Sequence, residues 1–454
     1  MRSILHIDFN SYFATVEQQA NPRLRSKPIG VTGGDRMKRT VLGAASVEAK
    51  KFGVKTGMQI WEAKKLCPGI ILVPGDSDKY LEVTKRFLGI LKGYSPYLEV
   101  FSIDEVFLEI LSSGHSGAER SEAIESKLGK DSIGRPLASL QNDMIKMAHE
   151  IKSRIKSEIG EWITCSIGIS YNKLMAKLAG SLQKPDGLVI IPDQKHAIEI
   201  LDRVELDEIC GIGERIKARL NKMGIFSFKT LRQVPKEILL FQFKSYGNFL
   251  FNAARGIDES LIIPFYDKEE VKSVSHRHTI DHDTNDPEEI KQILLKLTEL
   301  VARRLRAKNL VGKTVSCWFR YSLHPDHTPG VSSMGTPGLH PGGERVFEGD
   351  GMQETIHYTD DGLEIFKTTW KLFENIWDRG EIRMIGVSIS NLTPQTPLNL
   401  SLLEENKKKE VITKALDKIN DKYGEFTLKR AALLGTPTIR RMPTPFLADR
   451  RFKL

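Results

Sequence analysis

The sequence is poor in cysteine and has no long apolar run, and each absence excludes a class of protein. Its four cysteines lie far apart and form no Cys-x-x-Cys pair: Cys67, Cys165, Cys210 and Cys317. This spacing excludes a thiolate zinc site and is typical of a reducing compartment. No stretch approaches the roughly 18 apolar residues of a membrane-spanning helix. The N-terminus enters a strand pattern directly, without a secretion signal. We therefore expect a cytoplasmic protein with no membrane partner.

The chain is long and mildly basic. Its 454 residues allow about three domains at roughly 150 residues each. Hydrophobic residues make up 40% and charged residues 28%, which is typical of a globular protein with several cores. The net charge of +9 suits a polyanionic partner. Residues 395–454 alone hold 13 Lys and Arg against 7 Asp and Glu, so the basic excess is concentrated in the tail.

Alternating strand and helix patterns predict a mixed domain over the first 190 residues. The predicted strands are 3–9, 98–102, 106–110, 163–170 and 187–191, and the predicted helices are 79–94, 141–159 and 173–182. This order is typical of a ferredoxin-like sheet, with the strands at 98–102 and 106–110 forming a hairpin. Short strands at 28–31 and 41–45 and helical spacing at 47–53 and 60–66 predict a smaller subdomain. Residues 112–139 are rich in Gly and Ser and indicate a surface insertion.

Short helical patterns follow residue 191 and predict a small all-helical domain that ends near 258. A charged link at 267–272 leads to a second mixed domain. Its predicted strands are 273–281, 315–321 and 382–391, and its predicted helices are 287–308 and 364–377. Residues 322–351 contain seven Gly and four Pro, which predicts a loop. The basic tail contains one predicted helix, at 408–423.

Three acidic residues form the strongest chemical pattern. Asp8 ends the first predicted strand, and Asp104 and Glu105 lie at the tip of the predicted hairpin. In a ferredoxin-like sheet these elements are neighbours, so the carboxylates can converge. Converging carboxylates raise one another's pKa unless a cation neutralises them. Mg²⁺ prefers oxygen ligands, and two such ions can hold both oxygens of a displacement at phosphorus. A strand-end cap and an exposed turn would explain the same acids, and spacing alone leaves both interpretations open.

Five fragments occur in the order that is found in one family of enzymes. They are His6-Ile7-Asp8-Phe9-Asn10-Ser11-Tyr12-Phe13-Ala14, Glu48-Ala49-Lys50-Lys51-Phe52-Gly53-Val54-Lys55, Ser102-Ile103-Asp104-Glu105, Gly168-Ile169-Ser170 with Asn172-Lys173, and Lys184-Pro185-Asp186-Gly187. Over about residues 1–260 the sequence therefore resembles the Y-family DNA polymerases, and within them the bacterial DNA polymerase IV branch. Each fragment is weak alone, but five in order make the resemblance specific.

The resemblance implies an α+β multidomain fold, the right-hand polymerase. Its parts would be a ferredoxin-like palm (1–11 and 78–190), small fingers (12–77), a helical thumb with a helix-hairpin-helix (191–262), an α/β little finger (271–394) and a basic C-terminal tail (395–454). The implied activity is template-directed translesion synthesis without proofreading, which adds dNTPs to a primer 3′-hydroxyl. A non-catalytic scaffold of the same fold that binds DNA and clamp is the alternative. Three intact acids argue against it.

The resemblance also implies roles for single residues. Asp8, Asp104 and Glu105, with the backbone carbonyl of Phe9, would hold two Mg²⁺ ions. The implied nucleotide contacts are Tyr12, Phe13, Lys50 and Lys184. Phe13 would be a steric gate against a ribose 2′-hydroxyl, and the lysines would neutralise triphosphate oxygens. From the residues alone, a helix-core aromatic is the favoured interpretation of Phe13, and a solvated side chain is the favoured interpretation of each lysine.

Three positions depart from the common family pattern. Asn10 stands where an acid is frequent, Val47 where Tyr is frequent, and Lys50 where Arg is frequent. The second and third changes remove a hydroxyl and a bidentate guanidinium. They predict a weaker hold on the triphosphate.

Two further regions resemble the family's DNA contacts. Gly211 and Gly213, followed by Lys217, resemble a helix-hairpin-helix whose backbone amides approach a phosphate. A plain helix-turn-helix packing motif is the alternative there. Lys272 and Arg277 lie on the strand that we expect against the template phosphates.

A short peptide after the second mixed domain resembles the Gln-Leu-Ser-Leu-Phe peptide by which bacterial polymerases bind the sliding clamp. It spans Asn399 to Leu403, with Leu400, Leu402 and Leu403 as apolar anchors. The expected partners are therefore primer-template DNA, a dNTP and a bacterial sliding clamp. We expect the protein itself to be a monomer.

Overall fold

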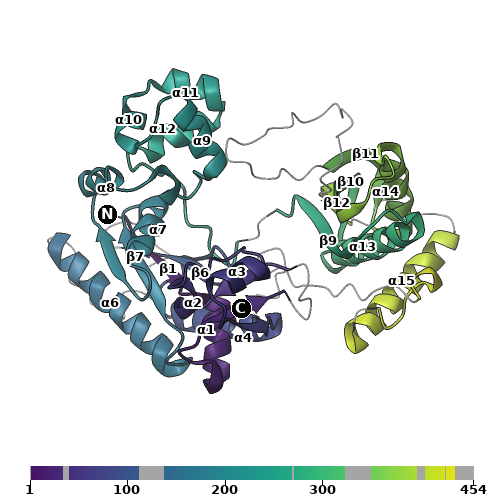
Figure 1. Cartoon of the computed structure of the whole chain (residues 1–454), viewed down its shortest axis with the longest axis horizontal. Helices are drawn as coiled ribbons and strands as arrows, with labels where there is room; N and C mark the ends of the chain where they lie inside the picture. The colour runs from purple at the N-terminus through teal and green to yellow at the C-terminus, as the bar shows by residue number, and fades with distance from the viewer. Residues whose placement is uncertain are drawn as a thin grey trace. The chain divides into compact units, whose positions relative to one another are not determined.

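The computed structural model describes residues 2–33, 40–111, 137–267, 270–322, 349–395, 404–424 and 426–434 (Figure 1). They belong to two compact units, one containing the chain up to residue 268 and the other containing residues 269–442. Within these ranges no helix is both long and apolar enough to cross a bilayer.

A five-stranded sheet forms the centre of the first unit. Its strand order is β5-β6-β1-β7-β8, and β1 pairs antiparallel with both β6 and β7. The strands are β1 (Arg2–Phe9), β5 (Leu98–Val100), β6 (Glu105–Leu111), β7 (Cys165–Ser170) and β8 (Leu188–Ile191). The predicted hairpin and its place beside the first strand are confirmed.

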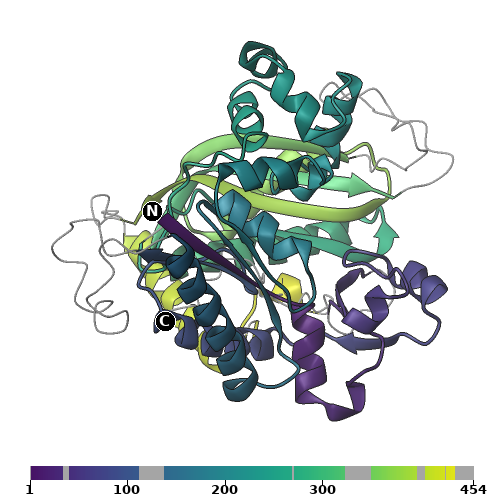
Figure 2. The ribbon, with the colours of Figure 1, turned by 90° about the vertical axis from the view of Figure 1, so that its left-hand side faces the viewer.

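Helices cover both faces of this sheet, because successive side chains of a strand point to opposite faces. Leu5, Ile7 and Phe9 are buried in the core that α4 (Ser77–Lys92) and α6 (Leu137–Glu158) share. The residues between them, His6 and Asp8, point to the opposite face. Helix α7 (Lys173–Leu182) lies on that face and connects the parallel strands β7 and β8. Figure 2 shows the helices around the sheet.

A smaller three-stranded sheet, in the order β3-β2-β4, follows the first helix. Its elements are α1 (Tyr12–Ala20), η1 (Pro22–Leu24), β2 (Ile29–Thr32), β3 (Leu42–Ala45), α2 (Val47–Lys50), α3 (Ile60–Leu66) and β4 (Ile71–Pro74). Strands β2 and β3 confirm the predicted ones within one residue. Strand β4 was not predicted, because a four-residue strand that ends in proline gives little periodic signal.

A helical bundle completes the first unit. It consists of α8 (Gln194–Leu201), η2 (Leu206–Glu208), α9 (Glu214–Lys222), α10 (Phe228–Gln233), α11 (Lys236–Phe243) and α12 (Tyr246–Ala253). Its apolar core also includes Leu174, Met175 and Leu178 of α7, so α7 has one side on the sheet and the other in the bundle. The chain then returns along the sheet edge, where Phe265 N–H donates to the Leu98 carbonyl at 2.8 Å.

The second unit contains an antiparallel sheet in the order β11-β10-β12-β9. Its elements are β9 (Ser273–Thr284), α13 (Pro287–Ala307), β10 (Leu310–Tyr321), β11 (Gly349–Thr359), α14 (Gly362–Ile376) and β12 (Ile382–Pro394). Both helices pack on this sheet and share one core with it. Strand β11 corrects the predicted loop at its end, since residues 349–351 begin a strand. Its polar, largely exposed side chains gave no apolar alternation to detect.

The tail helix α15 (Glu404–Tyr423) begins four residues before its predicted start and is joined to α13 by ion pairs. Arg306 holds Asp417 with two contacts of 2.6 and 3.0 Å, and Arg303 contacts Asp421. In η4 (Ala431–Leu433), Leu433 is 1% exposed. This part of the basic tail is therefore anchored to the second unit.

Candidate active site

Strand pairing brings the three predicted acids together. Asp8, near the end of β1, is directly opposite Glu105, the first residue of β6. Asp104 precedes Glu105 in the hairpin turn, and its carbonyl accepts a hydrogen bond from Phe9 N–H at 3.0 Å. Two segments that are far apart in the sequence therefore meet through backbone hydrogen bonds, as predicted. The Phe9 ring is buried and stacked on Phe87, so only its backbone is near the acids.

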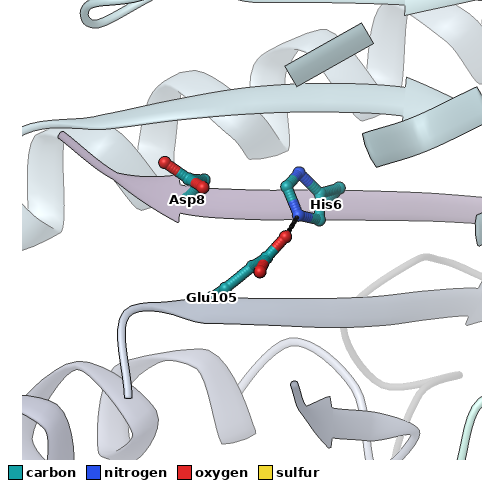
Figure 3. Close-up of side chains that lie close together, drawn as sticks. All are labelled: His6, Asp8 and Glu105. Atoms are coloured by element: carbon teal, nitrogen blue, oxygen red, sulfur yellow. Dashed lines mark hydrogen bonds and ion pairs between the residues drawn. The ribbon is translucent and has the colours of Figure 1, made fainter. Parts of the chain in front are cut away.

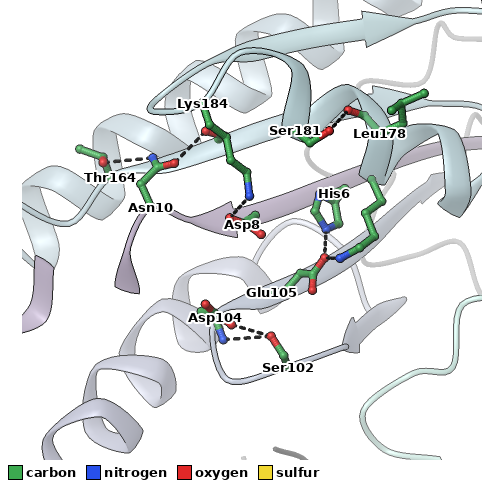
Figure 4. A network of polar contacts seen from close by, with 12 residues as sticks. His6, Asp8, Asn10, Ser102, Asp104, Glu105, Thr164, Leu178, Ser181 and Lys184 are labelled. Carbon is green, nitrogen blue, oxygen red and sulfur yellow. Dashed lines mark hydrogen bonds and ion pairs between the residues drawn. The ribbon is translucent and has the colours of Figure 1, made fainter. Parts of the chain in front are cut away.

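A histidine joins two of the acids. Ligand atoms of His6, Asp8 and Glu105 lie within 4.8 Å of one another (Figure 3). Asp104 is oriented differently, since its Oδ1 accepts a hydrogen bond from the Ser102 hydroxyl at 2.6 Å (Figure 4). That bond occupies one of its two carboxylate oxygens. The sequence prediction missed His6, although its place two residues before Asp8 on a strand puts both on one face.

Two lysines neutralise the acids. Lys184 Nζ lies 2.6 Å from Asp8 Oδ1, and Lys177 Nζ contacts Glu105 Oε1, which also contacts His6 Nε2. Burial, followed by the charge of Asp8, raises the pKa of Asp104. A carboxylate whose ionisation is disfavoured in this way gains from any cation placed beside it. The oxygen-rich donor set and its need for positive charge both fit a hard divalent cation.

The imidazole of His6 is buried and neutral. It is 1% exposed, lies 4.8 Å from the Phe107 ring between centroids, and has no hydrogen-bond partner at Nδ1. Burial is the main cause that lowers its pKa to about 3, and the charge of Lys177 acts in the same direction. A neutral ring can donate one hydrogen bond through Nε2–H, and Glu105 is the acceptor there.

Two glycines allow α7 to lie close enough to the sheet to bring both lysines over the acids. A Cβ at Gly168 of β7 would lie 2.1 Å from the Ala176 carbonyl oxygen of α7. A Cβ at Gly180 of α7 would lie 2.8 Å from His6 Nδ1. Any larger residue at either position would push α7 away from β1 and β7.

The structure separates the two aromatic residues predicted to contact a nucleotide. Tyr12 is 3% exposed, and its hydroxyl donates to the Tyr80 carbonyl and pairs with Thr84 Oγ1, both at 2.8 Å. Burial raises the pKa of this hydroxyl. The prediction that Tyr12 faces the nucleotide is therefore corrected for its side chain, which belongs to the core. Its backbone N–H remains at the start of α1.

Phe13 lies half-buried on a rigid support. Its ring stacks on Tyr80 with centroids 4.4 Å apart and planes 19° from parallel. The Tyr80 hydroxyl donates to Glu17 Oε1 at 2.8 Å, and Lys79 Nζ is 2.8 Å from Glu17 Oε2. Because the supporting ring is fixed through a buried carboxylate, Phe13 has little freedom to move aside.

The start of α1 offers polar groups without partners. Ser11, the residue before the helix, has a left-handed φ of 49°, and its hydroxyl is buried with no hydrogen-bond partner. Asn10 is instead fully engaged with β7 and the loop before it: Nδ2 donates to Thr164 Oγ1 at 3.1 Å, and Oδ1 accepts from Ser166 Oγ at 2.9 Å. The side chain at this position therefore contacts β7 and the loop before it. An asparagine in place of the frequent acid takes no carboxylate away from the acid cluster.

Lys50 lies at the end of α2. Ser46 caps the N-terminus of this helix, because its side-chain oxygen accepts a hydrogen bond from Ala49 N–H at 3.2 Å. Desolvation and the charge of Lys184 lower the pKa of Lys50, whereas the charges of Asp8 and Asp104 raise it. These interactions place Lys50 within electrostatic range of both the acids and the second predicted triphosphate lysine. Val47, the other departure in this region, begins the same short helix.

Both glycines of the predicted helix-hairpin-helix are exposed, but only one of them has free space for a side chain. Gly213 caps α9 and has open space around its Cα, whereas Gly211 is packed against α12, with the Tyr246 hydroxyl donating to its carbonyl at 2.5 Å. Lys217 is paired within the bundle, at 3.1 Å from Glu205 and 2.8 Å from Asp207. DNA contact by Lys217 would require it to exchange these partners.

The remaining predicted DNA contacts lie on or beside β9, an edge strand of the second unit. Lys272 precedes this strand and Arg277 lies on it, both exposed. Strand register places Arg277 opposite Gly386, and Gly386 opposite Trp318. The predicted clamp anchors, Leu400, Leu402 and Leu403, lie outside the described residues.

Comparison with known proteins gives consistent results over most of the chain. Residues 7–181 match the model of the impB/mucB/samB family, and residues 271–402 match that of the impB/mucB/samB family C-terminal domain. The chain is 34% identical over 435 residues to DNA polymerase IV of Moorella thermoacetica, covering 95% of this chain and 96% of the relative. It is 32% identical to DNA polymerase IV of Pelotomaculum thermopropionicum, covering 95% of each.

A solved structure shares the fold. The Y-family DNA polymerase chimera Dbh-Dpo4(243-245)-Dbh superposes with a TM-score of 0.67 at 22% identity. The match covers 86% of this chain and 99% of the chimera.

Proposed function

This chain belongs to the impB/mucB/samB family of Y-family DNA polymerases, and from that premise we propose how its residues carry out template-directed DNA synthesis. It is a DNA-directed DNA polymerase of the translesion class, with primer-template DNA and dNTPs as substrates. The observation that supports the site most strongly is the pairing of Asp8 with Glu105, beside Asp104. Palm, fingers, thumb and little finger are assigned to the predicted ranges 1–11 with 78–190, 12–77, 191–262 and 271–394.

The enzyme is metal-dependent, and we assign two Mg²⁺ ions to Asp8, Asp104, Glu105 and the carbonyl of Phe9. The fit rests on the oxygen donors and on the lysines that neutralise Asp8 and Glu105 in the structure. When bound, such ions polarise the α-phosphate and stabilise charge on the attacking and leaving oxygens. The side chains of this site then have two tasks, to hold the cations and to orient the primer 3′-hydroxyl toward the phosphate.

Groups at the start of α1 and two lysines are assigned to the triphosphate. Backbone N–H groups at a helix N-terminus attract anions, and the unpartnered Ser11 hydroxyl adds a donor there. Lys184 and Lys50 supply positive charge from the opposite elements, α7–β8 and α2. Phe13, held on Tyr80, is assigned as the wall that excludes a ribose 2′-hydroxyl.

The exposed sheet edge of the second unit is assigned to the DNA backbone. Lys272 and Arg277 are exposed beside and on the edge strand β9, and both can neutralise phosphates. In the first unit, the open surroundings of Gly213 at the start of α9 support a second phosphate contact. Lys217 contributes to that contact only if its acidic partners release it.

Primer extension tests the assigned function. The full-length chain with Mg²⁺ should extend a primer on both undamaged and abasic templates, and chelation of the metal should stop extension on both. A scaffold of the same fold would bind the primer-template in an anisotropy assay but extend neither primer. DNA binding without extension would therefore favour the scaffold and reject the enzyme assignment.

Two further assignments concern assembly. We assign residues 399–403 to a bacterial sliding clamp and the free protein to a monomer. Removal of residues 399–403 should abolish stimulation by the clamp while basal extension stays unchanged. A clamp response that survives the deletion would reject the peptide. Sedimentation at micromolar concentration should give one species with the mass of a single chain, and a concentration-dependent dimer would reject the monomer.

A further inference from the structure

We propose that Lys152 is a positioning residue for Lys184, and that it acts by fixing the turn from which Lys184 reaches the active site. The inference rests on the proposed contact of Lys184 with the triphosphate. Lys184 lies between α7 and β8, and its Nζ is 2.6 Å from Asp8 Oδ1. A lysine side chain is a flexible stem of four carbons, so the position of its backbone limits where its ammonium group can lie.

The turn that carries Lys184 is unusually tight. A Cβ at Gly187 would lie 1.9 Å from the Gln183 carbonyl oxygen, so the chain folds back directly onto the end of α7. Asp186, between them, has a left-handed φ of 58°. The Gly187 carbonyl accepts from Ile167 N–H of β7 at 3.0 Å, which joins the far end of the turn to the sheet.

Lys152 of α6 binds this turn at three points. Its Nζ donates to the Asp186 carbonyl at 2.5 Å and to the Gly187 carbonyl at 3.2 Å, and it lies 3.0 Å from Asp186 Oδ1. Two of the three donors of its ammonium group therefore have backbone acceptors within a single turn, and the contact with the Asp186 carboxylate is an ion pair. The Lys152 side chain is only 13% exposed, and a buried ammonium that loses its acceptors is costly. The turn and α6 are therefore locked together.

Lys156, one helical turn further along α6, is a natural control. It lies 3.0 Å from Asp186 Oδ2, and its side chain is 45% exposed. It reaches the carboxylate of the turn, whereas Lys152 also holds two backbone carbonyls. An exposed ion pair contributes little to stability. Substituting each lysine in turn therefore distinguishes a role in fixing the backbone of the turn from a role in the local charge.

The test measures dNTP dependence of primer extension by the full-length chain. Lys152→Met should raise the KM for dNTP about tenfold, because a small displacement of a contacting group is costly in catalysis. Affinity for primer-template should stay unchanged. Lys156→Met should leave KM within about twofold of the original value. In the double variant with Lys184→Ala, loss of Lys152 should add nothing to the effect of Lys184→Ala alone.

The outcomes separate this inference from the proposed function. If Lys184→Ala raises KM and Lys152→Met does not, the inference is rejected and the assignment of Lys184 stands. If Lys184→Ala leaves KM unchanged, the assignment of Lys184 is rejected, and the inference with it.

A purely structural role for Lys152 would lower the melting temperature and the active fraction, and therefore kcat, without moving KM. That pattern also overturns the inference, as do additive effects in the double variant. If Lys152→Met does not fold, Lys152→Gln, which stays polar but is shorter than lysine and removes the ammonium group, is judged by the same KM criterion.

Discussion

The five-stranded sheet of the first unit and the four-stranded sheet of the second unit both have antiparallel strands and packed helices, but their polar residues are placed differently. In the first unit, helices cover both faces, and the clustered carboxylates lie at strand ends, where two lysines neutralise them. In the second unit, α13 and α14 share the core with one face of the sheet. The opposite face carries exposed Ser275 and Arg277 beside half-buried Trp318.

This difference shows how burial determines the kind of chemistry a sheet supports. Charges in the covered sheet lie within contact distance of one another, so each change there alters the protonation or position of its neighbours. Charges on the exposed face act almost independently and are screened by salt. Substitutions in the first sheet should therefore cause large, coupled losses, and those in the second should cause small, salt-dependent ones.

The largest effect is expected at Asp104. Asp104→Asn should reduce primer extension by about a thousandfold or more, because the loss of a metal ligand removes several kcal/mol of charge stabilisation at the phosphorus atom. Asp281→Asn, an exposed acid on β9, is the matched change in the second sheet and should extend primers normally. Single-turnover rates measure both. Comparable losses in the two variants would remove the contrast between the sheets.

A smaller effect, on selectivity, is expected at Phe13. Phe13→Ala should lower the preference for dNTP over rNTP by about a hundredfold, the discrimination that an apolar wall provides against one hydroxyl. Phe241→Ala, which removes an aromatic ring that is 84% exposed on α11, should leave it unaltered. The ratio of kcat/KM values for the two sugars gives the answer. Unchanged sugar preference in Phe13→Ala would show that its ring is only part of the packing.

His6 should make the first unit sensitive to acid. Its folded-state pKa of about 3 lies below the ordinary histidine value of 6.5, so protons bind preferentially to the unfolded chain. The stability that this provides is complete above pH 6.5 and is lost as the pH falls toward 3, by up to about 1.4 kcal/mol per pH unit.

Thermal unfolding from pH 7.5 to 4.5 checks this direction. His6→Gln should flatten the pH dependence of the melting temperature. His357→Gln, at an exposed histidine of β11, should reproduce the original curve. A His6→Gln curve with the original slope would contradict the sign derived for this histidine.

The smallest effect is expected at Arg277. Arg277→Ala should weaken binding to primer-template only several-fold and reduce the salt slope of log K by about one. Arg86→Ala, at an exposed position of α4 in the first unit, should change neither quantity. Fluorescence anisotropy at several salt concentrations measures both. A salt slope equal to the original one would show that Arg277 does not contact phosphate.

Much of the fold followed from patterns along the chain. The helix at 60–66 occurs at its predicted bounds, and the hairpin with Asp104 and Glu105 at its turn lies beside the first strand as expected. Elements without apolar alternation were not predicted, above all β4 and β11. Their strand character depends on partners, β2 and β10, that no local signal identifies.

The candidate site was predictable in composition but not in orientation. The convergence of the acids was predicted from sequence and is confirmed, whereas Lys177 and His6 were missed, and the Tyr12 side chain, expected to face the triphosphate, is buried. A lysine on a helix and a histidine in a strand carry no pattern that distinguishes them from ordinary residues. Close packing of α7 on the sheet brings Lys177 to Glu105, and the pairing of β1 with β6 brings His6 there.

The sequence by itself determined which carboxylates could converge, because strand alternation and hairpin order place Asp8 and Glu105 on adjacent strands whatever surrounds them. Tertiary structure alone decided which lysines lie beside these carboxylates and which aromatic rings are buried in the core. Those choices depend on how closely helices approach the sheet and on which groups lose water, quantities set by contacts between segments that lie far apart along the chain.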